Sequence, residues 1–379
     1  MRMRRLLLIA GAALLGLAAP ASAAQVEKIA GGLDNPRHLA FGGGGLYVAE
    51  AGTGGDGPCA PGPAGGTACV GDTGAVTLID RHGGQRRIVE GLASLATEGT
   101  GDTAFGPHGV FVKGKRLLVT NGGPDGLDRD ELAAANPVAD LFGRVLGFKK
   151  HGELVRLVDV WGFERNNNPD AAVGNPEIDS NAVDVLADHG RLIVADAGGN
   201  TLLKAKKNGS VKVLTVFPNV PPDPTGMQAV PTGVVKGPDG DYFMTQLTGV
   251  PFPVGAANVF RIDRKTGEAE VFASGFTNLM DLAFGKDGTL WVLEIDHDSL
   301  AAGTNDGAIF AVDKNGKKTQ LDLPPGTLTH PGGITVREDG ALYVTNKSDL
   351  AGVGEVLKIT PDEDHHHGHH HHHGHHDHD

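Results

Sequence analysis

Aromatic side chains are scarce in this 379-residue chain, at 5%, and beyond residue 24 no apolar run is long enough to span a bilayer. Basic residues are too few for a nucleic-acid surface, because 33 Lys and Arg stand against 46 Asp and Glu, which disfavours nucleic acid as a partner. Neither a G-x-S-x-G nor an H-E-x-x-H motif occurs, so serine hydrolase and zincin chemistry have no support. The sequence is instead rich in glycine, with 58 residues, and in small aliphatic side chains, which favours short strands and tight turns.

The first 23 residues have the layout of a secretory signal peptide. A basic start precedes the apolar run Leu6–Ala19, and the small residues of 21–23 suit signal peptidase. We therefore expect residues 1–23 to be removed and the mature protein to be secreted or periplasmic, with no membrane span after removal. The alternative is that the segment is retained as an anchor.

The two cysteines, Cys59 and Cys69, lie in a stretch rich in Pro and Gly. In an exported protein such a pair is expected to form a disulfide. A metal or redox pair is the alternative, and the lack of a C-x-x-C spacing weighs against it.

One pattern recurs six times: an apolar triplet, a hairpin containing Gly, and a short apolar strand that ends in a polar residue. The copies span Pro36–Glu50, Pro107–Asn121, Asn181–Asp196, Pro231–Gln246, Leu279–Glu294 and Pro331–Asn346. Further strand patterns follow each copy, for example 259–263 and 270–273, which gives four strands per unit. The sequence therefore predicts an all-β, six-bladed β-propeller over residues 24–361. Two sandwiches of hairpins are the alternative.

The last copy lacks a fourth strand, because Pro361 and a polar tail follow Val356–Thr360. An unassigned strand pattern, Gln25–Ala30, precedes the first copy. We expect this N-terminal strand to complete the last blade and close the ring, which would remove two open sheet edges. Nothing between the copies resembles a linker, so we expect one domain. We also expect the protein to be a monomer.

Four segments, 46–50, 192–200, 231–233 and 331–333, read Leu-Tyr-Val-Ala-Glu, Leu-Ile-Val-Ala-Asp-Ala-Gly-Gly-Asn, Pro-Thr-Gly and Pro-Gly-Gly. On these segments residues 25–361 resemble NHL-like and gluconolactonase-like propellers and, more narrowly, the exported ScyD/ScyE-like family. The narrower resemblance implies a secreted or periplasmic protein with no single established activity. The related metal-dependent lactonases and lyases imply a calcium or zinc ion at the channel mouth, although the Glu-Gly-Pro-type opening segment of the gluconolactonase branch is missing here.

The long connections of the predicted ring all fall on one face, whereas the turns between first and second strands are short. We expect this loop-rich face to bind a small molecule or a protein. The polar residues that end the six second strands belong to its rim: Glu50, Asn121, Asp196, Gln246, Glu294 and Asn346. Their six side chains could hold Ca²⁺ in the central channel. Alternatively, they accept backbone N–H groups and tie the turns of the blades.

Polar side chains also stand at or near the start of the predicted inner strands: Arg37, His38, His108, Asp184, Asp281 and His330. Counted along each copy, Asp184 falls where the other five have Leu39, Val110, Val234, Leu282 and Ile334. A carboxylate facing the channel needs water, a cation or a partner such as Arg37. The three histidines could act as metal ligands or acid–base groups if they converge; alternatively, they are hydrogen-bonded rim residues.

The chain ends in a histidine-rich tail, residues 362–379. Its histidines are His365, His366, His367, His369, His370, His371, His372, His373, His375, His376 and His378. We expect this segment to be disordered and to capture Zn, Ni, Cu or Co. A purification tag is the alternative, although Gly368 and Gly374 interrupt the run.

Two functions remain open from the sequence. The first is an exported binding or scaffold protein with a ligand on its loop-rich face and transition metal on its tail. The second is a metal-dependent lactonase-like or lyase-like enzyme that acts at the channel mouth on a small extracellular substrate.

Overall fold

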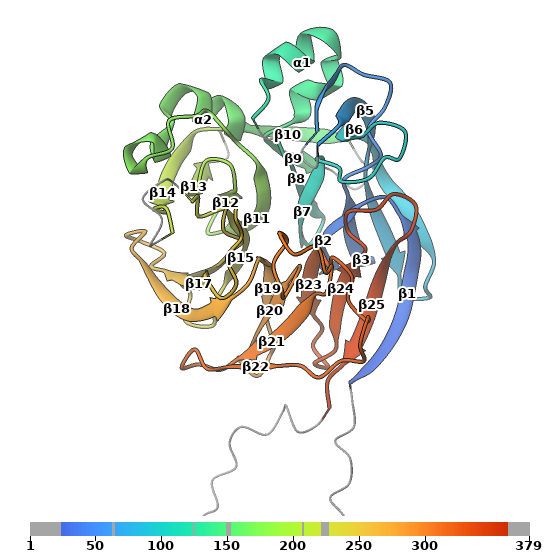
Figure 1. Ribbon diagram of the computed structural model, residues 1–379, viewed down its shortest axis with the longest axis vertical. Coiled ribbons are helices and arrows are strands. Elements are labelled where there is room, and N and C mark those ends of the chain that lie inside the picture. The colour runs from blue at the N-terminus through green and yellow to red at the C-terminus, as the bar shows by residue number, and fades with distance from the viewer. Residues whose placement is uncertain are drawn as a thin grey trace, which may run out of the picture.

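The computed structural model describes residues 24–362 except 63–64, 124–125, 149–152, 207 and 221–226, and gives no side chains for 155–157. Six antiparallel sheets are arranged as the blades of a propeller around a central axis, with four strands in the main sheet of each (Figure 1). The predicted six-bladed β-propeller is therefore confirmed. The expected signal peptide, residues 1–23, lies outside the described residues, as does the tail from residue 363 onward.

In blades 1 to 5 the strands follow one another along the chain from the inner strand outward, whereas the outer strand of blade 6 is β1. Blade 1 contains β2 (Pro36–Gly42), β3 (Gly45–Glu50), β5 (Thr67–Asp80) and β6 (Gln85–Thr97); blade 2 contains β7 (Pro107–Lys113), β8 (Arg116–Asn121), β9 (Arg144–Phe148) and β10 (Leu154–Asp159); blade 3 contains β11 (Ala182–Asp188), β12 (Arg191–Asp196), β13 (Thr201–Lys206) and β14 (Val211–Val216). Blade 4 contains β15 (Pro231–Lys236), β16 (Tyr242–Gln246), β17 (Ala257–Ile262) and β18 (Ala269–Phe276); blade 5 contains β19 (Leu279–Phe284), β20 (Leu290–Glu294), β21 (Ala308–Val312) and β22 (Lys318–Gln320); blade 6 contains β23 (Gly333–Val336), β24 (Leu342–Asn346), β25 (Gly354–Thr360) and β1 (Gln25–Leu33).

The ring is closed by strand β1, as the sequence predicts. This strand pairs antiparallel with β25, with Val26 opposite Ile359 and Gln25 opposite Thr360. Because the first strand of the chain supplies the outer strand of the last blade, both ends of the domain are held in one sheet and the sheet edge left by β25 is covered.

The second strand of each blade is buried on both faces, since each sheet packs between two neighbours. In β24, for example, Leu342 and Val344 are fully buried and Tyr343 almost so. One hydrophobic cluster joins Ile193 of blade 3 to Tyr242 of blade 4. This packing explains why these strands are continuous apolar runs rather than alternating ones.

The long connections carry the remaining elements. Cys59 and Cys69 form the expected disulfide, which joins the short strand β4 (Cys59–Pro61) to β5. The connections before and after β9 and β10 hold helices α1 (Arg129–Ala135) and α2 (Val160–Asn167) and the 3₁₀ helices η1 (Pro137–Leu141) and η2 (Pro169–Val173), which Figure 1 shows over one side of the ring. Among the described residues, no helix has the length and apolar character needed to cross a membrane.

The blades alternate in character, so the ring repeats every two blades. At one position of the inner strand, blades 1, 3 and 5 have His38, Asp184 and Asp281, whereas blades 2, 4 and 6 have Gly109, Gly233 and Gly333. The residue that ends the second strand is an acid in blades 1, 3 and 5 and an amide in blades 2, 4 and 6. The residue before it alternates in the same way, with threonine in the even blades: Thr120, Thr245 and Thr345.

The glycines of the even blades are needed because the next inner strand lies very close. A Cβ on Gly109 would lie 2.7 Å from the Cα of Asp184, and one on Gly333 would lie 2.7 Å from the Cα of His38. Only glycine tolerates such an approach of two backbones. The small residue of one blade thus makes room for the polar residue of the next.

Candidate functional site

The inner strands of alternate blades bring three polar side chains together on the channel axis. His38 of β2, Asp184 of β11 and Asp281 of β19 are all buried, and one ligand atom from each lies within 4.8 Å of the other two. Among the residues that the structure describes, this is the only group of three His, Cys, Asp or Glu side chains with such spacing. We call it the axial triad.

The position of Asp184 corrects one expectation from the sequence. Asp184 pairs with Ala195 and Asp281 with Leu293, the residue before the end of each second strand, so the two aspartates occupy equivalent positions. Asp184 therefore does not match Leu282, which is one residue further along. The aspartates are a repeated feature of the odd blades.

Each aspartate holds its own blade against the next. Asp184 accepts hydrogen bonds of 2.8 Å from the N–H groups of Val185 and of Val234 in blade 4. Asp281 does the same with Leu282 and with Ile334 in blade 6, again at 2.8 Å. These bonds fix both carboxylates rigidly, while each oxygen keeps a further lone pair for a proton or a metal ion.

Blade 1 has His38 at the position of this aspartate, and the hydrogen-bonding contacts of His38 differ from those of the aspartates. Its Nδ1 lies 3.5 Å from Oδ1 of Asp184, and its buried Nε2 has no hydrogen-bond partner among the described residues. Burial disfavours the imidazolium, but the negative charges of Asp281 and Asp184 outweigh it and raise the pKa of His38 to about 9. Burial, together with the charge of Asp184, raises the pKa of Asp281. Without a metal, the triad therefore holds an imidazolium beside two aspartates.

His108 lies next to the triad, with its ring edge-on to that of His38 at a centroid distance of 4.7 Å. Its Nδ1 donates a 2.9 Å hydrogen bond to the carbonyl oxygen of Val183, which leaves the lone pair on Nε2. Burial and the positive charges of His38 and Arg37 lower the pKa of His108 well below its ordinary value. His108 is thus a neutral imidazole beside a charged one.

Arg37 and His330 form a second polar group near the start of the inner strands. Arg37 donates a 2.6 Å hydrogen bond to the carbonyl oxygen of Ala104, and burial lowers its pKa to about 10 although Asp349 opposes the shift. His330 pairs through Nδ1 with Asp349 at 2.6 Å. The structure therefore places His38 and His108 in contact, whereas His330 is paired with an aspartate of its own blade.

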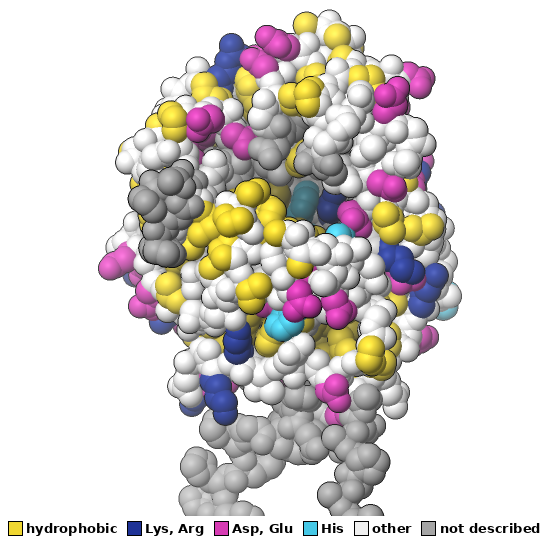
Figure 2. Space-filling model, viewed as in Figure 1, with side chains coloured by type: hydrophobic (Ala, Val, Ile, Leu, Met, Phe, Trp, Pro, Cys, Tyr) yellow, Lys and Arg dark blue, Asp and Glu magenta, His cyan; other side chains and the backbone are white. Residues whose placement is uncertain are grey.

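A cavity of about 420 Å³ extends from the axial triad along the channel. Its walls are the inner strands, and it reaches Lys113, Asp188 and Lys236 at or near the ends of β7, β11 and β15. Inner strands end at the short turns, so this cavity approaches the face opposite the long connections. None of the residues that line it belongs to the loop-rich face. On the face in Figure 2, the surface is hollowed near its centre, and histidine and Lys or Arg side chains lie inside the hollow.

The six residues that end the second strands are buried and bond within their own blade or an adjoining one. Glu50 binds Arg87 at 2.9 Å, Glu294 binds His297 at 2.5 Å, and Asp196 accepts from the Asn181 N–H at 2.7 Å. The three amides have local partners as well: Asn121 with Ala93, Gln246 with Asn258, and Asn346 with Thr329 and Glu355. Glu50, Asp196, Glu294 and Asn346 accept backbone N–H groups, as the alternative drawn from the sequence proposes.

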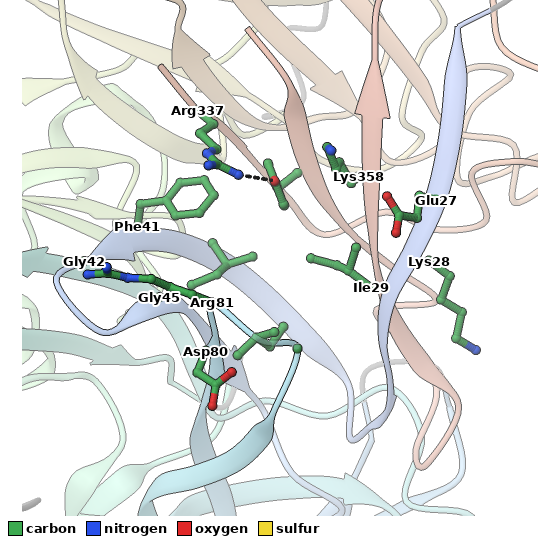
Figure 3. A pocket seen from close by; sticks show the side chains of 14 residues that line it. Glu27, Lys28, Ile29, Phe41, Gly42, Gly45, Asp80, Arg81, Arg337 and Lys358 are labelled. Atoms are coloured by element: carbon green, nitrogen blue, oxygen red, sulfur yellow. Dashed lines mark hydrogen bonds between the residues drawn. The ribbon is translucent and has the colours of Figure 1, made fainter. Parts of the chain in front are cut away.

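A larger groove of about 590 Å³ lies where blade 6 meets blade 1. Figure 3 shows Phe41 and Arg337 on one side of it and Ile29 and Lys358 on another, with a hydrogen bond of 3.3 Å from Arg337 to the Tyr343 hydroxyl. The groove exists because β1, the outer strand of blade 6, brings Glu27, Lys28 and Ile29 next to residues 79–83 of blade 1. No motif in the sequence points to it, since its walls come from both ends of the chain.

Comparisons with known proteins agree on the fold and no more. No family model and no curated protein matches the chain. A protein of unknown function from Bacteroides thetaiotaomicron has a TM-score of 0.52 at 12% identity, over 90% of this chain and 76% of its own. A glucose dehydrogenase has a TM-score of 0.51 at 12% identity over 89% and 99%, and a structural-genomics target described as a gluconolactonase has 0.51 at 12% over 90% and 93%. The chain is thus a six-bladed propeller similar in architecture to gluconolactonase and glucose dehydrogenase structures.

Proposed function

We propose that this protein is an exported binding propeller that holds one divalent transition metal ion at His38, Asp184 and Asp281. The observation that carries the proposal is the spacing of the axial triad, whose three ligand atoms lie within 4.8 Å of one another. One imidazole and two carboxylates suit zinc, manganese or iron. The two aspartates are fixed by backbone hydrogen bonds, so little rearrangement is needed to bind an ion.

A metal ion and a proton compete for His38. The ring must be neutral to ligate, and its pKa is raised to about 9 in the metal-free protein. Metal affinity therefore rises with pH, by about tenfold per unit below that pKa, until His38 is deprotonated without the ion. If the three side chains served only to stabilise the fold, the protein would bind no metal ion here and would show no pH-dependent metal affinity.

The cavity beside the triad supplies the binding site for a small polar ligand. Its volume of about 420 Å³ is in the range of small-molecule sites. Val110, Phe111 and Val234 give it apolar walls, while Lys113 and Lys236 lie at its far end. Asp188 pairs with Lys236 at 2.7 Å, which leaves Lys113 to favour an anionic group on the ligand.

A metal-dependent lactonase-like or lyase-like reaction is the second candidate, and His108 favours it. A neutral imidazole with a free Nε2 lone pair beside a metal ligand is suited to act as a general base. Structures described as a gluconolactonase and a glucose dehydrogenase share the fold, which supports a small-molecule site in the channel. If this candidate holds, His108→Gln abolishes turnover but leaves metal content unchanged.

Four further parts of the proposal come from the sequence. Export to an oxidising compartment is supported by the Cys59–Cys69 disulfide. Membership of the ScyD/ScyE-like family is supported by the strand motifs alone. Capture of Zn, Ni, Cu or Co by the histidines of residues 365–378, and a protein or small molecule on the loop-rich face, complete the proposed binding role.

Metal analysis of a protein that ends at Asp362 tests the main proposal without the tail histidines. We expect about one tightly bound ion per chain after incubation with Zn²⁺ or Mn²⁺ and desalting. His38→Gln should remove it, whereas His330→Gln, on a histidine paired with Asp349, should not. Absence of a stoichiometric ion in the parent protein, or its retention in His38→Gln, would refute the proposal.

A further inference from the structure

A groove of about 630 Å³ lies between blades 1 and 2, on the face where the inner strands end. Blade 1 forms one wall, from the β2–β3 turn out to the first residues of β6, and the β7–β8 turn of blade 2 forms the other. The two turns lie close together, because a Cβ on Gly42 would lie 2.5 Å from Cγ1 of Val112. We call this site the blade 1–2 groove. It shares no lining residue with the channel cavity beside the axial triad.

Every charged side chain among the described residues that line the blade 1–2 groove is basic. Arg87 is already paired, at 2.6 Å with Asp34 and at 2.9 Å with Glu50. The other cations of the lining form no ion pair among the described residues: Arg86, Lys115 and Arg116. Since the whole chain has a formal charge of -13, three unpaired cations at one groove make a local positive site that attracts anions.

The β7–β8 turn is the most basic of the six turns between first and second strands. It runs Lys113-Gly114-Lys115-Arg116 and contains no acid. The corresponding turns of blades 3 to 6 each contain at least one Asp, and the turn of blade 1, Gly42–Gly45, has no charge. Only Gly114 is needed for the backbone of the β7–β8 turn, since its φ is 62°. The fold therefore does not require the cations at residues 113, 115 and 116.

The rest of the lining is largely apolar. Its side chains are Tyr47, Leu78, Ile88, Val89, Val112 and Leu117. No described residue of the lining is Asp, Glu, Asn, Gln, Ser or Thr, so the Tyr47 hydroxyl is the one side-chain group here that can accept a hydrogen bond. A sugar or polyol would leave its hydroxyl donors without side-chain partners. A ligand that combines an acid group with an apolar body satisfies both parts of the lining.

Glycine at residue 44 keeps the apolar part of the groove open. A Cβ on Gly44 would lie 3.0 Å from the hydroxyl oxygen of Tyr47 and 3.4 Å from Cδ2 of Leu78. A longer side chain at residue 44 would therefore occupy the groove. The lining crosses β3, β5 and β6, which neighbour one another in the sheet, so it extends over roughly 10 Å at the usual strand spacing. This length suits a short acyl chain or an aromatic ring system.

We propose that the blade 1–2 groove binds an amphipathic organic acid, with the apolar body against Tyr47 and Leu78 and the acid group held by Arg86, Lys115 and Arg116. The volume of about 630 Å³ is in the range of small-molecule sites. The site is separate from the axial triad and does not depend on the proposed function.

Calorimetric titration of the full-length protein with octanoate provides the test, in chelator so that no ion at the axial triad can bind the carboxylate. Octanoate should bind, and raised salt should weaken it. Acetate lacks the apolar body and octanol lacks the charge, so each should bind roughly tenfold or more weakly. An octanoate titration without heat of binding in the parent, or an equal affinity for octanol, would overturn the proposal.

Substitutions locate the bound octanoate. Lys115→Gln and Arg116→Gln should each raise the Kd about three- to fivefold. Both residues are exposed, so the fold should be retained. Lys286→Gln provides the matched control, because it removes an exposed lysine from the equivalent turn of blade 5 and should leave the Kd unchanged. A Kd that responds equally to all three changes, or to none, would place octanoate elsewhere and refute the site.

A steric block tests the apolar part of the groove. Gly44→Leu should abolish octanoate binding while circular dichroism stays that of the parent; retained binding in the folded variant would contradict the proposal. If Gly44→Leu does not fold, the substitutions of the exposed cations decide alone. Binding of the parent to anionic phospholipid vesicles without binding of octanoate would show a membrane-facing surface instead of a small-molecule site, and the proposal would then be wrong.

Discussion

Replacement of His38 by glutamine should remove one pH-dependent component of stability from the metal-free protein. The raised pKa of His38, from 6.5 to about 9, means that the folded state binds a proton more tightly than the unfolded chain does. This difference corresponds to about 3 kcal/mol of unfolding free energy. Because the folded-state pKa is raised, the stabilisation is complete below pH 6.5 and disappears as the pH rises through about 9.

Urea denaturation in chelator at pH 6, 8 and 10 measures this component as a difference between two proteins. Burial raises the pKa of Glu164 to about 8 and that of Asp196 to about 6, but the substitution leaves both groups unchanged, so they cancel in the comparison. The pKa of Asp281 depends on the charge of His38, so its change is part of the measured difference. We expect His38→Gln to be about 3 kcal/mol less stable than the parent at pH 6 and the difference to vanish near pH 10.

His189→Gln provides the control, because His189 lies in the turn between β11 and β12 and is largely exposed. Its stability should follow the parent at every pH. A His38→Gln protein whose stability runs parallel to the parent from pH 6 to 10 would show that His38 is not protonated beside the aspartates, and the electrostatic account of the axial triad would be wrong.

Three other changes test the fold and the tail. Cys59→Ser should cost roughly 2 to 3 kcal/mol, because the disulfide closes a loop of about ten residues, and the melting temperature of the parent in reductant should fall to match. Gly233→Ala should cost about 1 to 3 kcal/mol in chemical denaturation, since its Cβ would lie 2.7 Å from Oδ1 of Asp281, whereas Gly43→Ala, with nothing within 4 Å, should be neutral. Deletion of residues 363–379 should abolish weak binding of several Zn²⁺ or Ni²⁺ ions in calorimetry without lowering Tm; a large drop in Tm would contradict the expectation of a free tail.

The fold was predictable because the second strands have a simple, repeated sequence pattern. Runs such as Leu342–Thr345 are buried on both faces, so they appear as unbroken apolar segments at regular spacing. The closing strand was predictable by elimination, since blade 6 lacked an outer strand and Gln25–Ala30 had no partner. Both inferences use backbone pairing, which depends little on the identity of individual side chains.

The sequence predicts the three residues of the axial triad as candidates but not that they occupy equivalent positions. The reason is an error of one residue in the alignment of the third copy. The third copy, taken from Asn181, is one residue out of register with the other five, because its strand begins at Ala182. No proline marks that start, as Pro36 does in blade 1, so the sequence pattern aligns Asp184 with Leu39 although the strand register aligns it with His38. A shift of one residue in a strand exchanges its two faces, and the match between Asp184 and Asp281 was therefore lost.

The proximity of the buried carboxyl groups of Glu164 and Asp196 could not be foreseen from the sequence. Glu164 belongs to a helix in the connection between blades and Asp196 to a strand, and no motif links them. Only the packing of α2 on the β12–β13 turn brings them together. The alternation of acids and amides at the ends of second strands was present in the sequence, however, and would have indicated that the odd blades form a set.

The pairing of β1 with β25 places the two ends of the ring side by side. Gln25 lies opposite Thr360, and both stand on the face where the inner strands finish, the same face that the channel cavity approaches. A short linker between these ends would yield a circular permutant with an uninterrupted last blade. It also follows that anything attached before residue 24 or after residue 362 leaves the ring from the outer half of blade 6, on the face that the channel cavity approaches.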